Sequence, residues 1–298
     1  MIEIKDLNKS YGKKKVLSNL NCNIKTNSIY GLIGANGAGK STLLRIINDI
    51  FKRDSGKIEI DGKEVEENEE LKQKLVFVPD DLYFFPNYSL LDMAKFYKSM
   101  YKNFDMDYVK ELAEILKLNI NTKLQNFSKG MKRQCALICA ISTNADYMFF
   151  DETFDGLDPV VRNLLKKIII KQMEKKDTTI IMTSHNLREL EDICDNLGLL
   201  YKGGILFESD IDSLKTNMFK IQISLKEDFN KEKFSKLDIM SFKKVGSVAT
   251  LIVKGDKVET ENELRKLNPI ILDFLPLTLE EIFIYEMEVL GYEFNQVV

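Results

Sequence analysis

Short apolar segments alternate with helical patterns through the first two thirds of the chain. Residues 2–7 alternate apolar and polar side chains, as a half-buried strand does. Residues 57–63 form a similar strand pattern that runs into a hairpin-type turn. Four further apolar runs have the length of buried strands in a parallel sheet: residues 28–33, 75–79, 147–150 and 178–182.

Helical patterns lie between these segments. Apolar residues recur at helical spacing from Lys40 to Phe51, and residues 89–143 are mostly helical in pattern and rich in aromatic side chains. Pro159 stands where the first turn of another helix is expected. Because strands and helices alternate, the pattern predicts an α/β fold with a mostly parallel sheet.

The pattern changes near residue 212, where we place a domain boundary. Strand patterns follow at residues 221–225 and 248–253, and residues 278–290 are expected to form a helix that closes the chain. The sequence therefore predicts a main domain over residues 1–212 and a small α+β accessory or regulatory domain over residues 213–298.

The composition is that of a globular protein outside the membrane. Of the 298 residues, 44% are hydrophobic and 30% charged, and the net charge of −3 argues against nucleic acid or an anionic membrane as the main partner. The longest uncharged stretch, residues 26–39, is too short to cross a membrane. The N-terminus lacks a signal-peptide pattern, and the four cysteines form no CxxC motif. We therefore expect a cytosolic protein without a zinc site or disulfides.

A glycine-rich loop separates the strand at residues 28–33 from the helix that follows. Residues 34–41 match the pattern GxxxxGK[ST]. Its glycines let backbone N–H groups surround a phosphate, and the helix N-terminus adds its positive dipole end. Lys40 can then reach the β- and γ-phosphates, and the Ser41 hydroxyl can bind Mg²⁺. An ordinary glycine-rich turn would not require this strand–loop–helix context, so we expect nucleoside triphosphate binding.

Two carboxylates and a histidine follow later strands. Asp151 is expected to hold Mg²⁺, and Glu152 to position or deprotonate an attacking water. His185, the single histidine of the chain, follows the strand at residues 178–182, at the edge where α/β sheets bind ligands. It can donate a hydrogen bond to a γ-phosphate. Each feature alone could be structural, but beside a phosphate loop they favour a catalytic site.

Together these motifs resemble the ATP-binding subunit of an ABC transporter of the bacterial exporter type, over residues 1–212. The matching motifs, in the family's order, are the Walker A loop (34–42), the signature motif (127–134), the Walker B strand (147–152), the D-loop (155–159) and the switch histidine (His185). The resemblance implies a P-loop NTPase core with an antiparallel β subdomain and a helical signature subdomain at about residues 82–143. It also implies an ATPase with Glu152 and His185 as catalytic residues.

The resemblance further implies a dimer, identical or mixed, in which two such domains pair head to tail with ATP between them. Ser128 and Gly130 of one copy would contact the ATP held by the other copy. The nucleotide-binding residues so implied are Tyr11, Gly34, Asn36, Gly37, Ala38, Gly39, Lys40, Ser41, Thr42, Ser128 and Gly130; the implied Mg²⁺ ligands are Ser41, Asp80 and Asp151.

The chain departs from the family's pattern at three places. Asp80 stands where glutamine is usual; it can approach Mg²⁺ but adds negative charge beside the phosphates. We therefore expect slow basal turnover, raised by Asp80→Asn or Asp80→Gln. Lys129 and Met131 replace commoner signature residues, and Thr153 replaces a proline. We expect these changes to leave the ATPase active.

No segment of the sequence spans a membrane, so the resemblance implies a separate polytopic permease that holds the chain at the inner face of the cell membrane. The aromatic segment at residues 82–88 lies where family members receive the permease, although it could equally pack the helical subdomain. Residues 277–283 also resemble the tail of the exporter group. The alternative is a cytosolic ABC ATPase without a transport role, for example in cofactor assembly.

Overall fold

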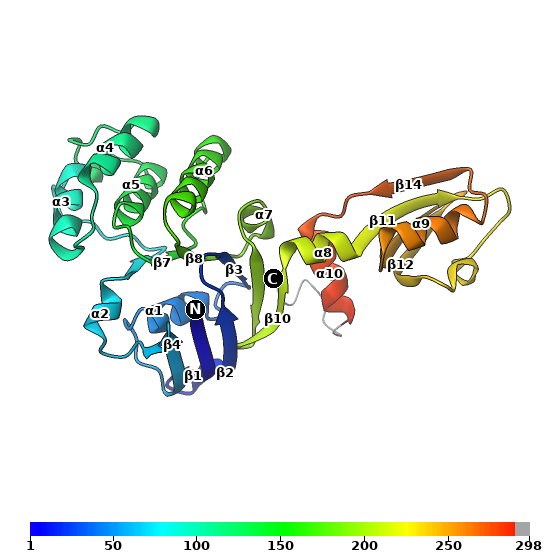
Figure 1. The fold of residues 1–298 in the computed structure, drawn as a ribbon, viewed down its shortest axis with the longest axis horizontal. Helices are drawn as coiled ribbons and strands as arrows, with labels where there is room; N and C mark the ends of the chain where they lie inside the picture. The colour runs from blue at the N-terminus through cyan, green and yellow to red at the C-terminus, as the bar shows by residue number, and fades with distance from the viewer. Residues whose placement is uncertain (290–298) are drawn as a thin grey trace. The chain divides into compact units, whose positions relative to one another are not determined.

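The computed structural model describes residues 1–289 of the chain. The chain divides into two compact units, Met1–Glu208 and Ser209–Val298, which are considered separately (Figure 1). The predicted boundary after residue 212 falls inside helix α8 (Ile211–Asn217).

The centre of the first unit is a six-stranded sheet. Its strands in spatial order are β10 (Gly204–Asp210), β9 (Asn196–Tyr201), β3 (Ile29–Ile33), β8 (Thr179–Ser184), β7 (Tyr147–Asp151) and β6 (Leu75–Val78). Strands β9, β3, β8, β7 and β6 are mutually parallel. The three central strands are buried along their whole length, as expected of a parallel sheet covered on both faces. The predicted parallel α/β core is confirmed.

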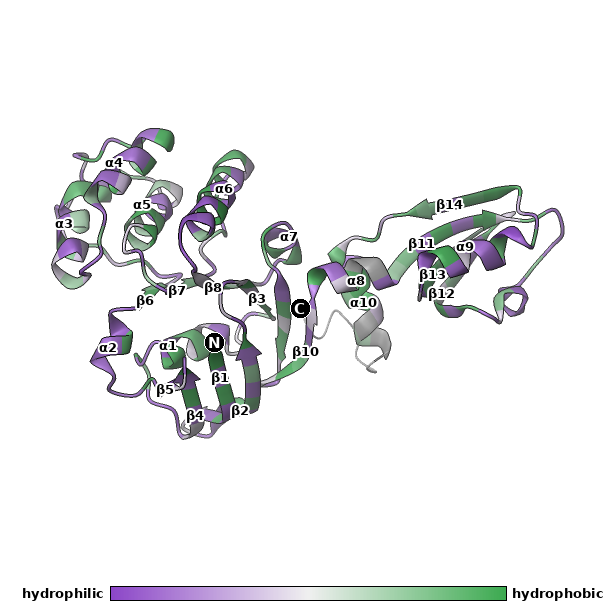
Figure 2. Ribbon diagram, in the orientation of Figure 1, coloured by the Kyte–Doolittle hydropathy of each residue, from purple (hydrophilic) through white to green (hydrophobic). Residues whose placement is uncertain are grey.

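The first unit contains a second sheet, in which neighbouring strands pair in antiparallel orientation. Its strands in spatial order are β2 (Lys14–Ile24), β1 (Ile2–Tyr11), β4 (Ser55–Ile60) and β5 (Lys63–Glu64). Hydrophobic and polar positions alternate along β2 and β4 (Figure 2). The apolar side chains form a core with helix α1 (Lys40–Ile47) and with the six-stranded sheet. The antiparallel β subdomain implied by the family resemblance is therefore present.

Helix α1 is shorter than the sequence pattern predicts. The prediction extended to Phe51, but the helix ends at Ile47 and Asn48 caps it. Asp49 then has a left-handed backbone with a φ of 54°, which no α-helix continues. The two apolar residues beyond this point, Ile50 and Phe51, therefore continue the helical spacing in the sequence but lie outside the helix.

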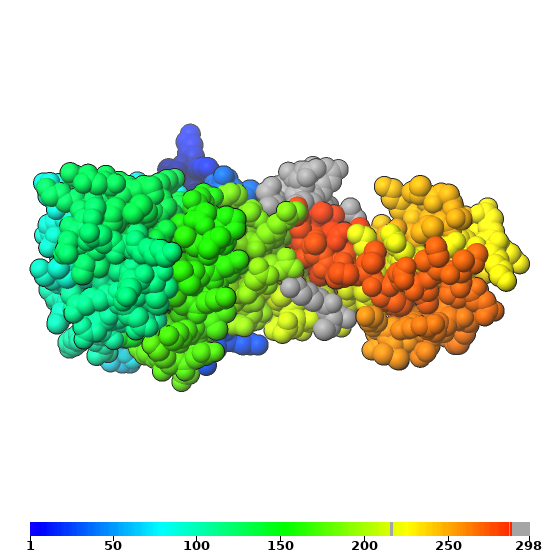
Figure 3. Space-filling model, turned by 90° about the horizontal axis from the view of Figure 1, so that it is seen from above, coloured from blue at the N-terminus to red at the C-terminus, as the bar shows by residue number. Residues whose placement is uncertain are grey.

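The helices of the middle third lie side by side, as Figures 1 and 3 both show. They are α3 (Leu90–Met100), α4 (Met106–Ile115), α5 (Lys129–Ile141) and α6 (Pro159–Lys175). Side-chain caps begin all four: Ser89, Asp105, Ser128 and Asp158 accept hydrogen bonds from first-turn N–H groups. Pro159 occupies the first helical position of α6. Three short elements complete the unit: α2 (Glu69–Lys72), η1 (Leu124–Asn126) and α7 (Leu187–Leu190).

The second unit contains a four-stranded antiparallel sheet with its own core. The strands in spatial order are β12 (Asp238–Val245), β13 (Val248–Lys254), β11 (Met218–Ser224) and β14 (Ile271–Leu275). Its other elements are α8, η2 (Lys231–Phe234), α9 (Lys257–Arg265) and α10 (Leu279–Val289). The expected closing helix corresponds to α10, and Leu290, its predicted last residue, lies outside the described residues. Sequence patterning did not predict β12, β14 or α9.

Candidate active site

Most of the predicted site residues of the first unit follow parallel strands. The phosphate loop follows β3, Asp80 follows β6, Asp151 ends β7 with Glu152 directly after it, and His185 follows β8. Because these strands are parallel, their carboxyl ends meet at one edge of the sheet, where α/β folds bind ligands.

The loop between β3 and α1 has the backbone of a phosphate cradle. Gly37 and Gly39 have φ angles of 82° and 114°, which favour glycine. A Cβ at Gly34 would lie 2.6 Å from the carbonyl oxygen of Leu200, so that position has no room for a side chain. Gly39 caps α1 without a side-chain hydrogen bond, which leaves the first-turn N–H groups available to an anion.

The remaining residues of the predicted cradle occupy the same segment. Asn36 and Ala38 lie in the loop, and the Ala38 N–H donates to the carbonyl of Ala35 at 3.1 Å. Ser41 and Thr42 lie in the first turn of α1, partly exposed. Their N–H groups therefore point out of the helix start, in the direction from which a phosphate would approach.

Lys40 is buried at the start of α1 and reaches back over the loop. Its Nζ donates to the carbonyl oxygens of Gly34 and Ala35, at 2.6 and 3.3 Å. The same Nζ lies 3.2 Å from Oε1 of Glu152. The charge of Lys40 is thus compensated by a carboxylate that follows a different strand.

Glu152 is held between Lys40 and His185. Its Oε2 lies 3.4 Å from Nδ1 of His185, while its backbone N–H donates to the Thr183 hydroxyl at 3.0 Å. The backbone φ of 46° is unusual for glutamate and indicates a constrained position. The structure therefore brings the two predicted catalytic side chains together next to the phosphate-binding lysine.

Asp151 is fully buried at the end of β7. Its Oδ1 accepts a hydrogen bond from the Thr183 hydroxyl at 2.7 Å. Burial raises the pKa of this carboxyl, although the nearby hydroxyls of Thr183 and Ser41 lower it in part. Among the described residues, its Oδ2 has no hydrogen-bond partner.

This arrangement fits a magnesium ion held together with a nucleotide. The unpartnered Oδ2 of Asp151 and the Ser41 hydroxyl are hard oxygen donors, which Mg²⁺ prefers. Over residues 1–289 no cluster of three or more His, Cys, Asp or Glu side chains could hold a metal by itself. Mg²⁺ commonly takes one or two protein ligands and completes its shell with phosphate and water.

An Asp151→Asn chain without nucleotide is expected to lose part of the pH dependence of folding. The folded pKa of Asp151 is raised above the unfolded value, so its contribution to stability falls as pH rises from about 4 through the folded pKa. At pH 8 the variant should be more stable than wild type, yet fail to bind ATP–Mg²⁺. Chemical denaturation at pH 4–8 measures this, with Asp146→Asn, at the opposite end of β7, as control. Identical pH profiles for wild type and Asp151→Asn would contradict the assignment.

Tyr11, the predicted adenine-stacking residue, ends β1 and is 45% exposed. Its ring packs edge-on against Phe51, with centroids 6.3 Å apart. The hairpin that carries it lies against the phosphate loop, since a Cβ at Gly39 would come within 3.2 Å of Val16 on β2. Because nearly half of the side chain is exposed, its ring is accessible to a base.

Ser128 and Gly130 begin helix α5. The Ser128 hydroxyl accepts from the Met131 N–H at 3.2 Å and so caps the helix. A Cβ at Gly130 would lie 3.7 Å from the side chain of Leu157 and 3.9 Å from the Gly156 carbonyl. The start of the signature helix thus packs beside the D-loop, and the contacts that the structure gives to it do not include the chain's own phosphate loop.

Asp80 has a different partner from the predicted one. Its Oδ1 accepts from Nη2 of Arg133 on α5 at 2.5 Å. The arginine compensates the carboxylate charge, which removes our reason for expecting faster turnover in Asp80→Asn or Asp80→Gln. A role for Asp80 at Mg²⁺ stays a prediction without a described contact to support it.

Sequence reasoning missed Thr183 and Arg133. Thr183 links the Asp151 carboxylate to the backbone of Glu152, because its hydroxyl donates to Asp151 and accepts from the Glu152 N–H. Its role depends on the pairing of Asp151 with Thr183 across β7 and β8. The sequence carries a weak signal for it, a hydroxyl residue at the end of a buried strand.

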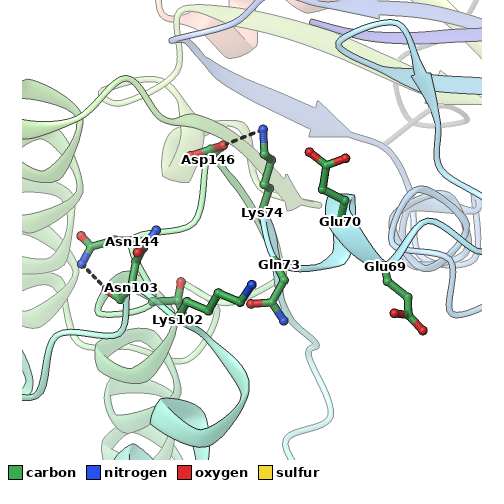
Figure 4. Close-up of a pocket in the computed structure, with 9 residues that line it drawn as sticks. Glu69, Glu70, Gln73, Lys74, Lys102, Asn103, Asn144 and Asp146 are labelled. Atoms are coloured by element: carbon green, nitrogen blue, oxygen red, sulfur yellow. Dashed lines mark hydrogen bonds and ion pairs between the residues drawn. The ribbon is translucent and has the colours of Figure 1, made fainter.

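A cavity of about 560 Å³ lies at the other edge of the sheet (Figure 4). Lys74 and Asp146 precede β6 and β7, so the cavity is at the amino ends of these strands and away from the phosphate loop. It is lined by Glu69, Glu70, Gln73, Lys74, Lys102, Asn103, Thr143, Asn144 and Asp146. Figure 4 shows Lys74 turned toward Asp146, an ion pair at 3.7 Å. This cavity is therefore not part of the predicted ATP site.

Comparison with known proteins agrees with the site geometry. A family model described as "ABC transporter" matches residues 17–155. The chain is 31% identical to the ABC transporter ATP-binding protein YtrB of Bacillus subtilis (strain 168) over 284 residues, which cover 95% of this chain and 97% of that protein. It is 32% identical to the lantibiotic transport ATP-binding protein SrtF of Streptococcus pyogenes over 213 residues, or 71% of this chain and 92% of that protein.

The first unit of this chain has the same fold as a solved structure described as the ATP-binding subunit of an ABC transporter. The TM-score is 0.65 at 25% identity, and the match covers 72% of this chain and 92% of the other. In the part of the chain that the structure describes, every helix is too short or too polar to cross a membrane.

Proposed function

The chain belongs to the ABC transporter family as an ATP-binding subunit that hydrolyses ATP, and from this premise we propose that it drives a separate membrane permease by cycles of ATP-dependent dimer closure and opening. The observation that carries the catalytic part is the position of Glu152, between the phosphate-loop lysine and His185. Similarity to YtrB along almost the whole chain supports the transport part.

In the proposed hydrolysis of ATP, each side chain of the site has one role. The N–H groups of the loop and Lys40 bind the β- and γ-phosphates, while Ser41 and Asp151 are the residues that would hold Mg²⁺. When phosphate binds Lys40, the Lys40–Glu152 ion pair is released and Glu152 can accept a proton from the attacking water. His185, 3.4 Å from Glu152, would donate a hydrogen bond to the γ-phosphate.

The dimer is proposed because one copy leaves the site incomplete. Ser128 and Gly130 begin helix α5, and the contacts described for these two residues are with their own helix and the D-loop. In a head-to-tail pair the N-terminus of this helix can meet the γ-phosphate bound by the partner copy. ATP would then favour the closed pair, and loss of the γ-phosphate would favour the open one.

The permease is proposed to be an exporter, with this subunit bound at the cytoplasmic face of the membrane. A relative, SrtF, is described as serving lantibiotic transport, which supports an export-type cargo for this chain. The exposed Tyr83 and the half-exposed Phe85 offer an aromatic surface to such a partner.

Purification of a tagged Glu152→Gln chain from detergent-solubilised membranes of its own host, with ATP–Mg²⁺ present, tests the proposal. A polytopic membrane protein recovered in fixed ratio, and lost with a Lys40→Met chain, is the expected result. An ATP-dependent dimer without a membrane partner would instead support the cytosolic ABC ATPase that the sequence left open.

A further inference from the structure

Arg133 is a buried charge in the helix that begins with Ser128. Its side chain is 2% exposed, and it lies in the second turn of α5. An arginine keeps its charge at any pH that a folded protein meets. Its position is therefore determined by the carboxylates and carbonyls that its guanidinium reaches.

The carboxylate that it reaches comes from another part of the chain. Nη2 donates to Oδ1 of Asp80, which follows β6 and is separated from Arg133 by 53 residues. The Asp80 side chain is 48% exposed, so the pair joins a solvent-facing loop to a buried helix position.

The second guanidinium nitrogen lies beside the D-loop. A Cβ at Gly156 would be 3.9 Å from Nη1 of Arg133, and within residues 1–289 this buried Nη1 has no hydrogen-bond partner. Gly130, in the first turn of the same helix, also lies near the Gly156 carbonyl. Arg133 therefore stands where the loop after β6, the start of α5 and the D-loop meet.

We propose that Asp80 and Arg133 form a positioning pair that sets the start of helix α5, and with it Ser128, for contact with ATP on a second copy of this chain. The inference rests on the proposed dimer and deepens it. Removing Asp80 alone leaves the buried charge of Arg133 without its carboxylate, whereas removing both partners can leave the fold intact. If the position of the α5 start depends on the pair, that position should be lost in both cases. The free energy of unfolding should fall only when Asp80 alone is removed.

The test uses the Glu152→Gln chain as reference and adds Asp80→Asn, Arg133→Met or both. ATP affinity and the dissociation constant of the ATP-dependent dimer are measured by titration calorimetry and analytical ultracentrifugation. The double variant is expected to unfold at the reference midpoint and, at ATP concentrations that saturate each chain, to dimerise about tenfold more weakly than the reference. Asp146→Asn, which breaks the Asp146–Lys176 pair at 2.6 Å at the other edge of the sheet, is the matched control and should dimerise like the reference.

A double variant that dimerises as tightly as the reference would overturn the positioning role and leave the proposed function standing. A reference chain that does not dimerise with ATP would overturn the proposed dimer and this inference together.

Discussion

A Glu152→Gln chain is expected to hydrolyse ATP about 10²- to 10⁴-fold more slowly than wild type and still bind ATP. General-base catalysis supplies rate factors of this size, equal to a barrier increase of about 3–5 kcal/mol. Glutamine keeps the shape of the side chain and can remain beside Lys40 and His185, but its amide cannot accept the proton of the attacking water. Steady-state phosphate release and ATP binding, measured on the same preparation, separate these two effects.

The control for this variant is Glu174→Gln, a substitution of the same type at an exposed position of α6. It should leave phosphate release unchanged. If Glu152→Gln retained a rate within tenfold of wild type, the water would be activated by another group, and the assignment of Glu152 as the base would be wrong.

Replacing Lys40 by methionine is expected to weaken ATP binding by about 30- to 4,000-fold and to abolish measurable hydrolysis. Lys40 is 4% exposed, so its contact with phosphate would be largely desolvated. Truncating one partner of a buried charge pair costs about 2–5 kcal/mol, and 1.4 kcal/mol corresponds to a tenfold change in affinity. Methionine fills a similar volume, which limits the damage to packing around the loop.

The matched control is Lys166→Met. Lys166 is also buried, at 6% exposure, and pairs with Asp192 at 3.4 Å, but it belongs to α6 and not to the phosphate loop. Calorimetric titration with ATP–Mg²⁺ should give wild-type affinity for this control. Equal affinities for Lys40→Met and wild type would show that the loop binds phosphate without its lysine.

Much of the site could be predicted because its motifs are local in the chain. The loop at residues 34–41 needs glycines, a lysine and a hydroxyl at consecutive positions, whatever the rest of the chain does. Asp151 and Glu152 follow a short apolar run that could only be a buried strand beside such a loop. Strand–helix alternation then placed both segments at one edge of a parallel sheet.

The elements that patterning missed have different causes. Strand β12 mixes polar and apolar residues because all of its side chains are at most partly buried, and α9 presents mostly charged residues to solvent. Neither carries a period strong enough to distinguish it from a loop. The end of α1 was misplaced because apolar residues continued the helical spacing past a left-handed Asp49.

The sequence by itself determined the chemistry of this protein: a phosphate loop, a carboxylate pair and a histidine in the order of an ABC ATPase. The tertiary structure decided which polar side chains pair, namely Lys40 with Glu152, Asp151 with Thr183, and Asp80 with Arg133. These contacts depend on strand register and on helix packing between residues far apart in the chain. No local sequence pattern predicts them. For this reason Asp80, which the sequence predicted as a Mg²⁺ ligand, was found in the structure as the partner of a buried arginine.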